Sequence, residues 1–263
     1  MQTTYPLTIE GSSQRHIYKT IHFNDGQPVI ELDIHVFLPK NAATGAGVIF
    51  FHGGGWTGGT VAQFRNQAEL LAEHGMVVFL PKYRLGSEHG VTPFTCLADA
   101  KSAVRWVKAH AKDFGLDSER LALGGGSAGG HLAAASSLVA GYEDSDENYE
   151  FSPAGSALCL FNPVIDTTAL GYGHERLSSH AESFSPVHNV GPDAPPTIIF
   201  QGLDDTTTPP ENARSFDARM KELGKDCTVH WYEGRSHGFF NVIEYDDTSQ
   251  KMLAFFQDLG YAI

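Results

Sequence analysis

A serine flanked on both sides by glycines is the feature that most constrains this chain. Residues 121–131 read LALGGGSAGGH, an apolar run followed by glycines around Ser127. The run is typical of a buried strand and the Ala-rich residues 127–140 of a helix, so we expect a sharp strand-to-helix turn at the serine. Gly125 and Gly129 would let the turn close. The hydroxyl would then be exposed beside a helix N-terminus, which favours developing negative charge and suits a nucleophile.

The same glycines admit other interpretations. Gly124, Gly126 and Gly129 match the G-x-G-x-x-G fingerprint of dinucleotide-binding proteins, which requires an acidic residue after the next strand, about 20 residues on. Glu143 and Asp144 stand instead in a polar stretch with no strand before them. A phosphate-binding loop needs a lysine before the serine, and the turn has none. A merely structural glycine turn is the remaining alternative.

Short apolar runs alternate with helical patterns along the chain. Residues 47–51 and 76–80 are typical of buried strands, and residues 93–114 carry apolar side chains at helical spacing. This alternation predicts an α/β fold with a mostly parallel central sheet and helices on both faces. In such sheets chemistry gathers at the carboxyl ends of the strands. We expect further strands at 121–123, 157–161, 197–200 and 227–232, and helices at 60–74, 127–140, 210–223 and 247–259.

The N-terminal part of the chain has a different pattern. Residues 16–23 and 29–38 alternate between apolar and polar around an Asn-Asp-Gly turn at 24–26, which predicts a β-hairpin. The length is typical of one α/β domain, so we expect residues 1–263 to form a single domain. Residues 141–196 are rich in Asp, Glu, Ser and Pro, and we expect an irregular insertion near the active site there rather than a second domain.

A second glycine run reads HGGGW at residues 52–56 and follows the strand expected at 47–51. Three glycines in a row weaken a regular element, but they present backbone N–H groups to an anion without obstruction. The amide of Ala128, directly after the serine, would complete such an anion cradle. The alternative is a flexible turn. We expect His52 to be a structural hydrogen-bonding residue rather than a base.

Two later strands are each expected to end in a polar loop that carries a titratable side chain. Asp204 and Asp205 follow one of them, and His237 follows the last. The order serine, acid, histidine is one of the known arrangements of nucleophile, acid and base. His237 would take the proton of Ser127 and return it to the leaving group, while the acid fixes the imidazole tautomer. Both aspartates are candidates; Asp205 is preferred, with Asp204 as a turn or cap residue.

Charge and cysteine usage argue against several other classes. The chain has 18 basic and 31 acidic residues, a net charge of -13, which would repel nucleic acid and anionic membranes. Cys96, Cys159 and Cys227 have no paired spacing, so neither a disulfide framework nor a zinc site is expected. Residues 1–19 lack the pattern of a leader peptide, and no apolar run is long enough for a membrane span. We therefore expect a cytoplasmic protein, or a periplasmic or secreted one if a leader has been removed.

Three motifs together carry a family resemblance. HGGGW at 52–56, GGSAGG at 125–130 and HGFF at 237–240 resemble the bacterial acetyl-esterase and lipase branch of the α/β hydrolases. That branch is related to the hormone-sensitive-lipase group and to small carbohydrate esterases. The resemblance covers residues 45–257, and the three motifs in this order are highly specific.

The resemblance implies an α/β-hydrolase fold, a minimal cap, and neither a metal nor an organic cofactor. The acid of the family falls three residues after a glycine, here Gly202, which favours Asp205. The site residues implied are Ser127, Asp205 and His237 as the catalytic triad, and the amides of Gly54, Gly55 and Ala128 as oxyanion donors. We expect Trp56 to contact substrate.

The resemblance also implies an activity. We expect a serine carboxylic-ester hydrolase that forms an acyl-enzyme on short acyl esters, acetyl esters above all, with carbohydrate and feruloyl esters as candidate substrates. Gly126 and Gln201 stand where the branch often has Asp and His, a departure that concerns the subfamily rather than hydrolysis. The alternatives are an amide hydrolase, arylformamidase- or peptidase-like, with the same triad, and a non-catalytic ligand receptor. The sequence does not indicate an oligomeric state.

Overall fold

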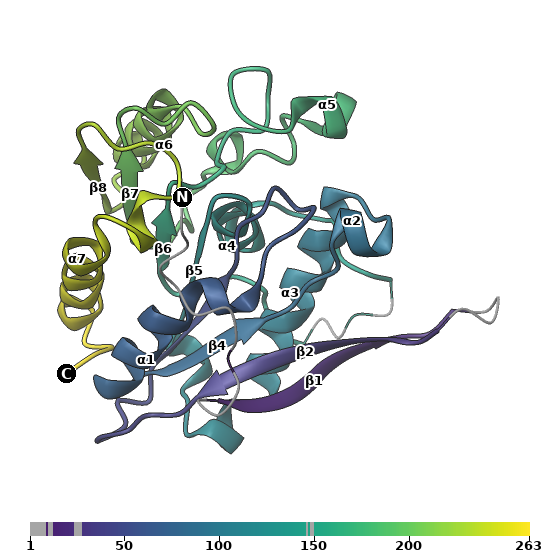
Figure 1. The fold of residues 1–263 in the computed structure, drawn as a ribbon, viewed down its shortest axis with the longest axis vertical. Coiled ribbons are helices and arrows are strands. Elements are labelled where there is room, and N and C mark those ends of the chain that lie inside the picture. Colours follow the sequence, from purple (N-terminus) through teal and green to yellow (C-terminus); the bar gives the residue numbers. More distant parts are fainter. Residues whose placement is uncertain (1–8, 10–12, 24–27, 146, 148–149) are drawn as a thin grey trace.

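The computed structural model describes residues 9, 13–23, 28–145, 147 and 150–263. The hairpin turn expected at 24–26 lies outside these ranges. Within them, eight strands form one sheet in the order β1-β2-β4-β3-β5-β6-β7-β8 (Figure 1). The strands are β1 (Gln14–Ile21), β2 (Ile30–Phe37), β3 (Gly47–Phe51), β4 (Val77–Pro81), β5 (Leu121–Gly126), β6 (Leu158–Phe161), β7 (Thr197–Gly202) and β8 (Cys227–Tyr232).

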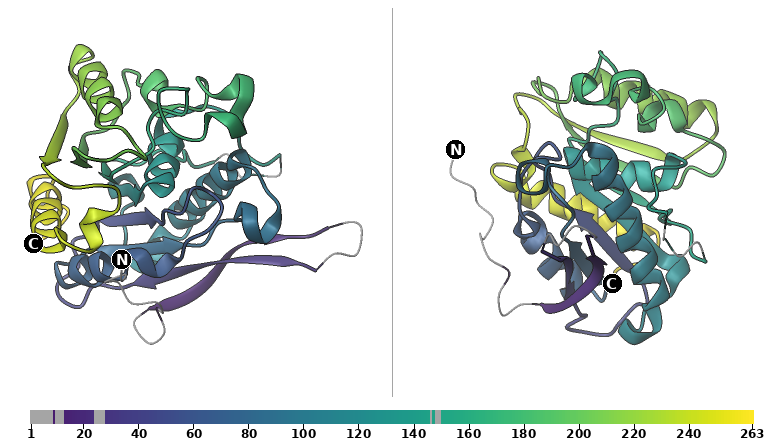
Figure 2. Two further views of the ribbon diagram at one scale, coloured as in Figure 1. Left: turned by 45° about the horizontal axis from the view of Figure 1, so that its top comes forward. Right: turned by 90° about the vertical axis from the view of Figure 1, so that its right-hand side faces the viewer.

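The pairing of the strands agrees with the expected mostly parallel sheet. β1 pairs with β2 and β2 with β4 in antiparallel register, and every other neighbouring pair is parallel. Figure 2 shows β1 and β2 as a long two-stranded ribbon that projects from one edge of the molecule. Because β5, β7 and β8 are parallel, their carboxyl ends meet along one edge of the sheet, and the loops after them can converge there.

Helices cover both faces of the sheet, as the near-continuous apolar strands require. Alternate residues of a strand face opposite ways, so Ile49 and Phe51 pack on one side and Val48 and Phe50 on the other. Buried residues of α3, α4 and α6 join the first side, and those of α1 and α7 join the second. The main helices are α1 (Arg65–Glu73), α3 (Pro93–Ala109), α4 (Ala128–Leu138), α6 (Pro210–Glu222) and α7 (Tyr245–Asp258), with single turns at α2 (Gly86–His89) and α5 (His174–Leu177).

The irregular insertion expected over 141–196 is not continuous, because the strand expected at 157–161 interrupts it. β6, a fully buried strand in the middle of the sheet, runs through this stretch at Leu158–Phe161. Only the parts on either side are irregular. The part after β6, residues 162–196, contains α5 and short 3-10 turns, and we call it the cap segment.

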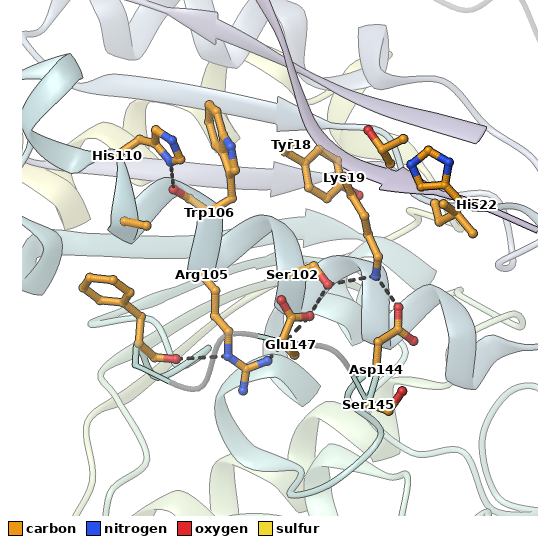
Figure 3. Close-up of a pocket in the computed structure, with 14 residues that line it drawn as sticks. Tyr18, Lys19, His22, Ser102, Arg105, Trp106, His110, Asp144, Ser145 and Glu147 are labelled. Carbon is orange, nitrogen blue, oxygen red and sulfur yellow. Dashed lines mark hydrogen bonds and ion pairs between the residues drawn. The ribbon is translucent and has the colours of Figure 1, made fainter. Parts of the chain in front are cut away.

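A cavity of about 580 Å³ lies between β1, α3 and the side chains of Asp144, Ser145, Glu147 and Phe151 (Figure 3). Its charged side chains are paired with one another: Lys19 Nζ lies 2.9 Å from Asp99 Oδ1 and 2.5 Å from Asp144 Oδ2. Arg105 Nε donates to the Phe151 carbonyl at 3.0 Å. These contacts hold β1, Asp144 and Phe151 against α3. The cavity shares no lining residue with the one at Ser127.

No helix of the described residues is long and apolar enough to cross a membrane.

A buried carboxylate on α3 generates a stability prediction. Asp99 is fully buried and accepts hydrogen bonds from Arg84 Nε at 2.8 Å and Arg84 Nη2 at 2.7 Å, besides its ion pair with Lys19. We expect Asp99→Asn to lower the free energy of unfolding by about 3–5 kcal/mol, because two cations lose their buried partner. The matched control is Glu222→Gln, which breaks an exposed pair with Arg219 and should cost about 0–1 kcal/mol. Urea denaturation measures both, and equal losses would contradict the prediction.

Candidate active site

The turn at Ser127 is as sharp as the glycine pattern predicts. Ser127 joins β5 to α4 with φ 54° and ψ -121°, a conformation that non-glycine residues rarely adopt. A Cβ on Gly125 would lie 2.5 Å from the Gly129 carbonyl, and one on Gly129 would lie 2.0 Å from the Phe51 carbonyl. Side chains at either position would therefore prevent the turn from closing against β3.

Backbone hydrogen bonds to the end of β6 and the residues after it hold the turn at Ser127 from the other side. The Ser127 amide donates to the Phe161 carbonyl at 3.0 Å, and the Ser127 carbonyl accepts from the Val164 amide at 3.0 Å and from the His131 amide at 3.1 Å. The backbone on both sides of the serine is thus hydrogen-bonded. Its strained dihedrals are held by these bonds and by the closeness of β3.

Ser127, His237 and Asp205 lie in a hydrogen-bonded chain. His237 Nδ1 is 2.8 Å from Asp205 Oδ2, and His237 Nε2 is 2.9 Å from Ser127 Oγ. An ionised carboxylate can only accept, so Nδ1 carries the proton, and Nε2 is left to accept from the serine hydroxyl. The three loops after β5, β7 and β8 thus bring together the three side chains that the sequence singles out.

The surroundings of the two aspartates distinguish Asp205 from Asp204. Asp205 is buried, and its Oδ1 accepts from the amides of Thr207 and Thr208 at 2.9 Å each, while its Oδ2 accepts from Thr208 Oγ1 at 2.8 Å. Burial alone would raise the pKa of Asp205, but the hydrogen bond and charge of His237, together with the Thr208 donors, lower that pKa below its ordinary value. Asp204 is exposed, and its amide donates to the Arg235 carbonyl. Asp205 is therefore the carboxylate that stays ionised beside the imidazole.

The glycine run at 52–56 presents two amides to the same place. The Gly53 carbonyl lies 2.8 Å from His52 Nδ1, and the Gly54 carbonyl accepts from the amides of Thr57 and Gly58. In a trans peptide the N–H points away from the C=O, so the amides of Gly54 and Gly55 face the opposite way. Neither amide has an acceptor among the described residues. Together with the Ala128 amide at the start of α4, they are the three amides that the sequence predicts as oxyanion donors.

A cavity of about 250 Å³ opens between Ser127 and these amides. The Phe240 ring forms one wall of the cavity. It packs against the buried rings of Phe64 and Phe161, which hold it in place. The cavity is lined by Gly53, Gly54, Gly55, Gln63, Gly126, Ser127, Asn162, Tyr172, Thr207, His237, Gly238 and Phe240.

The expectation that Trp56 contacts substrate needs correction. Trp56 is 1% exposed and does not line the cavity. Its ring packs under Tyr172, at a centroid distance of 5.6 Å, and edge-on against His131 at 5.2 Å. Trp56 has a positive φ, which turns its side chain back into the core. Tyr172, from the cap segment, occupies the cavity wall instead.

Several residues that complete the site were missed in the sequence. Asn162, directly after β6, has φ 36°, and its Oδ1 accepts from the amide of Gly238, next to His237. Gln63 Oε1 accepts from the Gly53 amide at 2.6 Å and fixes the start of the glycine run. An asparagine between an apolar run and a proline was a visible signal, because Asn tolerates the left-handed conformation. Gln63 and Tyr172 carried no comparable signal.

A serine at the exit of β5, with an acid after β7 and a histidine after β8, is the arrangement of the α/β hydrolases. A family model described as BD-FAE matches residues 32–170, and one of the prolyl oligopeptidase family matches residues 164–260. The first match covers more than half of the chain, which therefore belongs to the BD-FAE family, among the esterases of the α/β-hydrolase superfamily. The predicted fold class and the resemblance to this esterase and lipase group are confirmed.

Solved structures of esterase 2 from Thermogutta terrifontis are similar over nearly the whole chain. The form phosphoramylated by tabun superposes with a TM-score of 0.88 at 36% identity, covering 96% of each chain. The propionate-bound form gives 0.87 at 36% identity with the same coverage. Among curated relatives, esterase LipC of Mycobacterium tuberculosis is 31% identical over 73% of this chain. This chain spans about half the length of such relatives, 52% for LipC and 49% for the probable carboxylic ester hydrolase LipM of the same organism.

The hydrogen bonds of the two aspartates give the first prediction for this site. We expect Asp205→Asn to lower turnover of a chromogenic ester about 10⁴-fold, because an amide no longer holds the Nδ1–H tautomer of His237. Asp204→Asn, its exposed neighbour, is the matched control and should change turnover less than about twofold. Steady-state kinetics on purified variants measure both. The reverse ranking would exchange the roles of the two residues.

Two buried histidines beside the glycine run give a pH prediction. Burial lowers the pKa of His52 and of His131 to about 4, against hydrogen bonds to the carbonyls of Gly53 and Phe184 that raise it. In the unfolded chain these rings bind protons below about pH 6.5, but in the folded protein they do so only near pH 4. The stability that the two neutral rings contribute is therefore complete above about pH 6.5 and is lost as the pH falls toward about 4. Each ring should account for a loss on the order of 3 kcal/mol in the free energy of unfolding.

Urea denaturation across this pH range measures the loss, and His131→Gln isolates one ring. The variant should be less stable than the wild type at pH 7.5 but should lose less on acidification. An unchanged pH dependence in His131→Gln would show that the buried imidazole is not the group that titrates.

Proposed function

We propose that this protein is a serine carboxylic-ester hydrolase that acts through an acyl-enzyme. The observation that carries the proposal is the hydrogen-bonded chain Asp205–His237–Ser127 beside the free amides of Gly54 and Gly55. The sequence and fold similarity to esterases supports it. The catalytic roles of these residues are part of the proposal.

The geometry accommodates each step of acyl transfer. Ser127 Oγ attacks the ester carbonyl as His237 Nε2 takes its proton, and the resulting oxyanion accepts hydrogen bonds from the amides of Gly54, Gly55 and Ala128. Asp205 stabilises the imidazolium. His237 then gives its proton to the departing alcohol, which leaves an acyl group on Ser127. Water, deprotonated by His237, attacks the acyl-enzyme, and return of that proton to Ser127 releases the carboxylic acid.

The size of the cavity favours short acyl chains. About 250 Å³ of space is bounded by the rings of Tyr172 and Phe240, and Phe240 is held by its aromatic neighbours. The related esterase 2 has been solved with propionate and with butyrate bound. We therefore propose acyl groups from acetyl to butyryl as preferred substrates. Acetylated carbohydrates and feruloyl esters are the candidate natural esters to test first, on the resemblance to small carbohydrate esterases.

A second candidate is amide hydrolysis by the same triad. The match of residues 164–260 to the prolyl oligopeptidase family favours it, because this part of the chain supplies both Asp205 and His237. The attack chemistry is common to both reactions. The two reactions differ in the leaving group. Amide hydrolysis expels an amine, which must be protonated before it departs, whereas hydrolysis of an aryl ester expels an aryl alcohol, which leaves readily.

A series of p-nitrophenyl esters from acetate to decanoate tests the proposal. We expect kcat/KM to be highest between acetate and butyrate and to fall at least about tenfold by octanoate, because longer chains meet the two rings. Tyr172→Ala should raise activity on the longer esters, and Ser127→Ala should abolish turnover of all of them. Matched p-nitroanilides test amide cleavage. A preference for decanoate, or turnover of anilides at the rate of esters, would contradict the proposal.

A further inference from the structure

We propose that Arg176 of the cap segment is a positioning residue that fixes the oxyanion loop, residues 52–58. The inference rests on the proposed function, since it assigns a role to a residue of the same site. Arg176 lies in α5, 121 positions from the loop residue it contacts. Its Nη1 donates to the carbonyl of Gly55 at 2.7 Å. None of the motifs in the sequence points to this residue.

Three successive carbonyls of the oxyanion loop have three different partners. The first two, Gly53 and Gly54, are held from within the loop, by the His52 ring and by the amides of Thr57 and Gly58. The third, Gly55, is held by the Arg176 guanidinium. Among the described residues it is therefore the cap segment, and not the loop itself, that fixes the peptide after Gly55.

This third contact matters because of the conformation of Gly55. Gly55 has φ 62°, in a region that glycine enters and leaves without steric cost, so its own dihedrals do not hold it. The Gly55 carbonyl lies in the peptide after Gly55 and the Gly55 amide in the peptide before it, so the two peptides meet at the Gly55 Cα. Holding the carbonyl therefore fixes the ψ angle of Gly55 and restrains the Cα that carries the amide facing Ser127. An oxyanion donor is effective only when it is already aimed at the developing charge. A charged hydrogen bond to the Gly55 carbonyl supplies that restraint.

Arg176 is exposed, and the neighbouring residues of the cap segment place it against the oxyanion loop. The guanidinium lies over the Tyr172 ring, 5.6 Å from its centroid, and Arg176 Nε is 3.4 Å from Glu175 Oε1. A Cβ on Gly55 would lie 2.6 Å from the Tyr172 hydroxyl, and a Cβ on Gly173 would lie 2.7 Å from the Trp56 ring. The segment therefore meets the loop at two glycines, with no space for a side chain at either.

The cap segment is itself anchored near the end of β6. The Asp166 carbonyl accepts from the Tyr172 amide at 3.0 Å, and Asp166 Oδ1 accepts from the Thr168 amide at 2.8 Å. Asp166 is buried, and a Cβ on Gly171 would lie 1.9 Å from its carbonyl. The turn that precedes Arg176 is thus held by hydrogen bonds, and it directs the Arg176 side chain toward the Gly55 carbonyl.

The test compares two substitutions at Arg176 with a matched surface control. Arg176→Met keeps the length of the stem over Tyr172 but removes all donors, whereas Arg176→Lys keeps a charge and a donor. Arg219→Met removes an exposed arginine of α6 that pairs with Glu222, far from the loop in sequence and outside the site. For each protein, kcat and KM on p-nitrophenyl butyrate, the rate of phosphonylation by a fluorophosphonate, and the thermal unfolding midpoint are measured.

We expect Arg176→Met to lower kcat about tenfold, because a misplaced donor costs less than a deleted one, for which the loss is about 100-fold or more. KM should stay within twofold, phosphonylation should slow in parallel, and the unfolding midpoint should match that of Arg219→Met. Arg176→Lys should recover most of the rate. This pattern supports a positioning role, since the loss falls on the chemical step and not on folding or on substrate binding.

Two results would overturn the inference. One is wild-type kcat and phosphonylation in Arg176→Met; the other is a rise in KM with unchanged kcat, which would make Arg176 a substrate contact. The proposed function fails separately, if the wild-type protein is phosphonylated but hydrolyses no ester. In that case the relative phosphonylation rates still decide the role of Arg176. A wild-type protein that is neither phosphonylated nor active refutes both.

Discussion

The closure of the backbone around Ser127 is the constraint on which the rest of this structure depends. The turn needs glycine at 125 and 129 because the carbonyls of Gly129 and Phe51 occupy the space that side chains would need. Phe51 ends β3, which lies directly beside β5 in the sheet, and this closeness is what excludes side chains at the two positions. The strand order places the glycine run after β3 next to Ser127, so the proposed nucleophile and the proposed oxyanion donors are neighbours. Asp205 and His237 follow β7 and β8, which lie on the other side of β5.

Much of this arrangement could be predicted from the sequence, for physical reasons. Strands buried on both faces leave apolar runs, and the polar residues after them mark the edge where loops converge, which is how Ser127, Asp205 and His237 could be chosen. The choice of Asp205 over Asp204 needed the family spacing. The structure adds a physical reason: the Asp205 carboxylate accepts hydrogen bonds from two backbone amides and from the Thr208 hydroxyl. These donors are positioned by the fold of the loop, so the sequence alone does not reveal them.

Other parts of the site could not be predicted, because their position depends on long-range packing. Residues 162–196 have no period, so neither Tyr172 nor Arg176 could be placed beside the oxyanion loop. Trp56 was expected at the substrate because it follows the glycine run, but its positive φ and the space beside Gly173 direct its ring into the core. In both cases the contact partner comes from a segment over 100 positions away.

The bonds of Ser127 with the exit of β6 have a consequence for how such a protein can change its substrates. The Ser127 amide donates to the Phe161 carbonyl, and the Ser127 carbonyl accepts from the Val164 amide. The first residues of the cap segment therefore help to hold the turn at Ser127. A graft that exchanged caps between related enzymes would have to join downstream of Val164, and it would have to bring a replacement for Arg176. The part of the cap that can be exchanged is thus the stretch of chain between Val164 and β7.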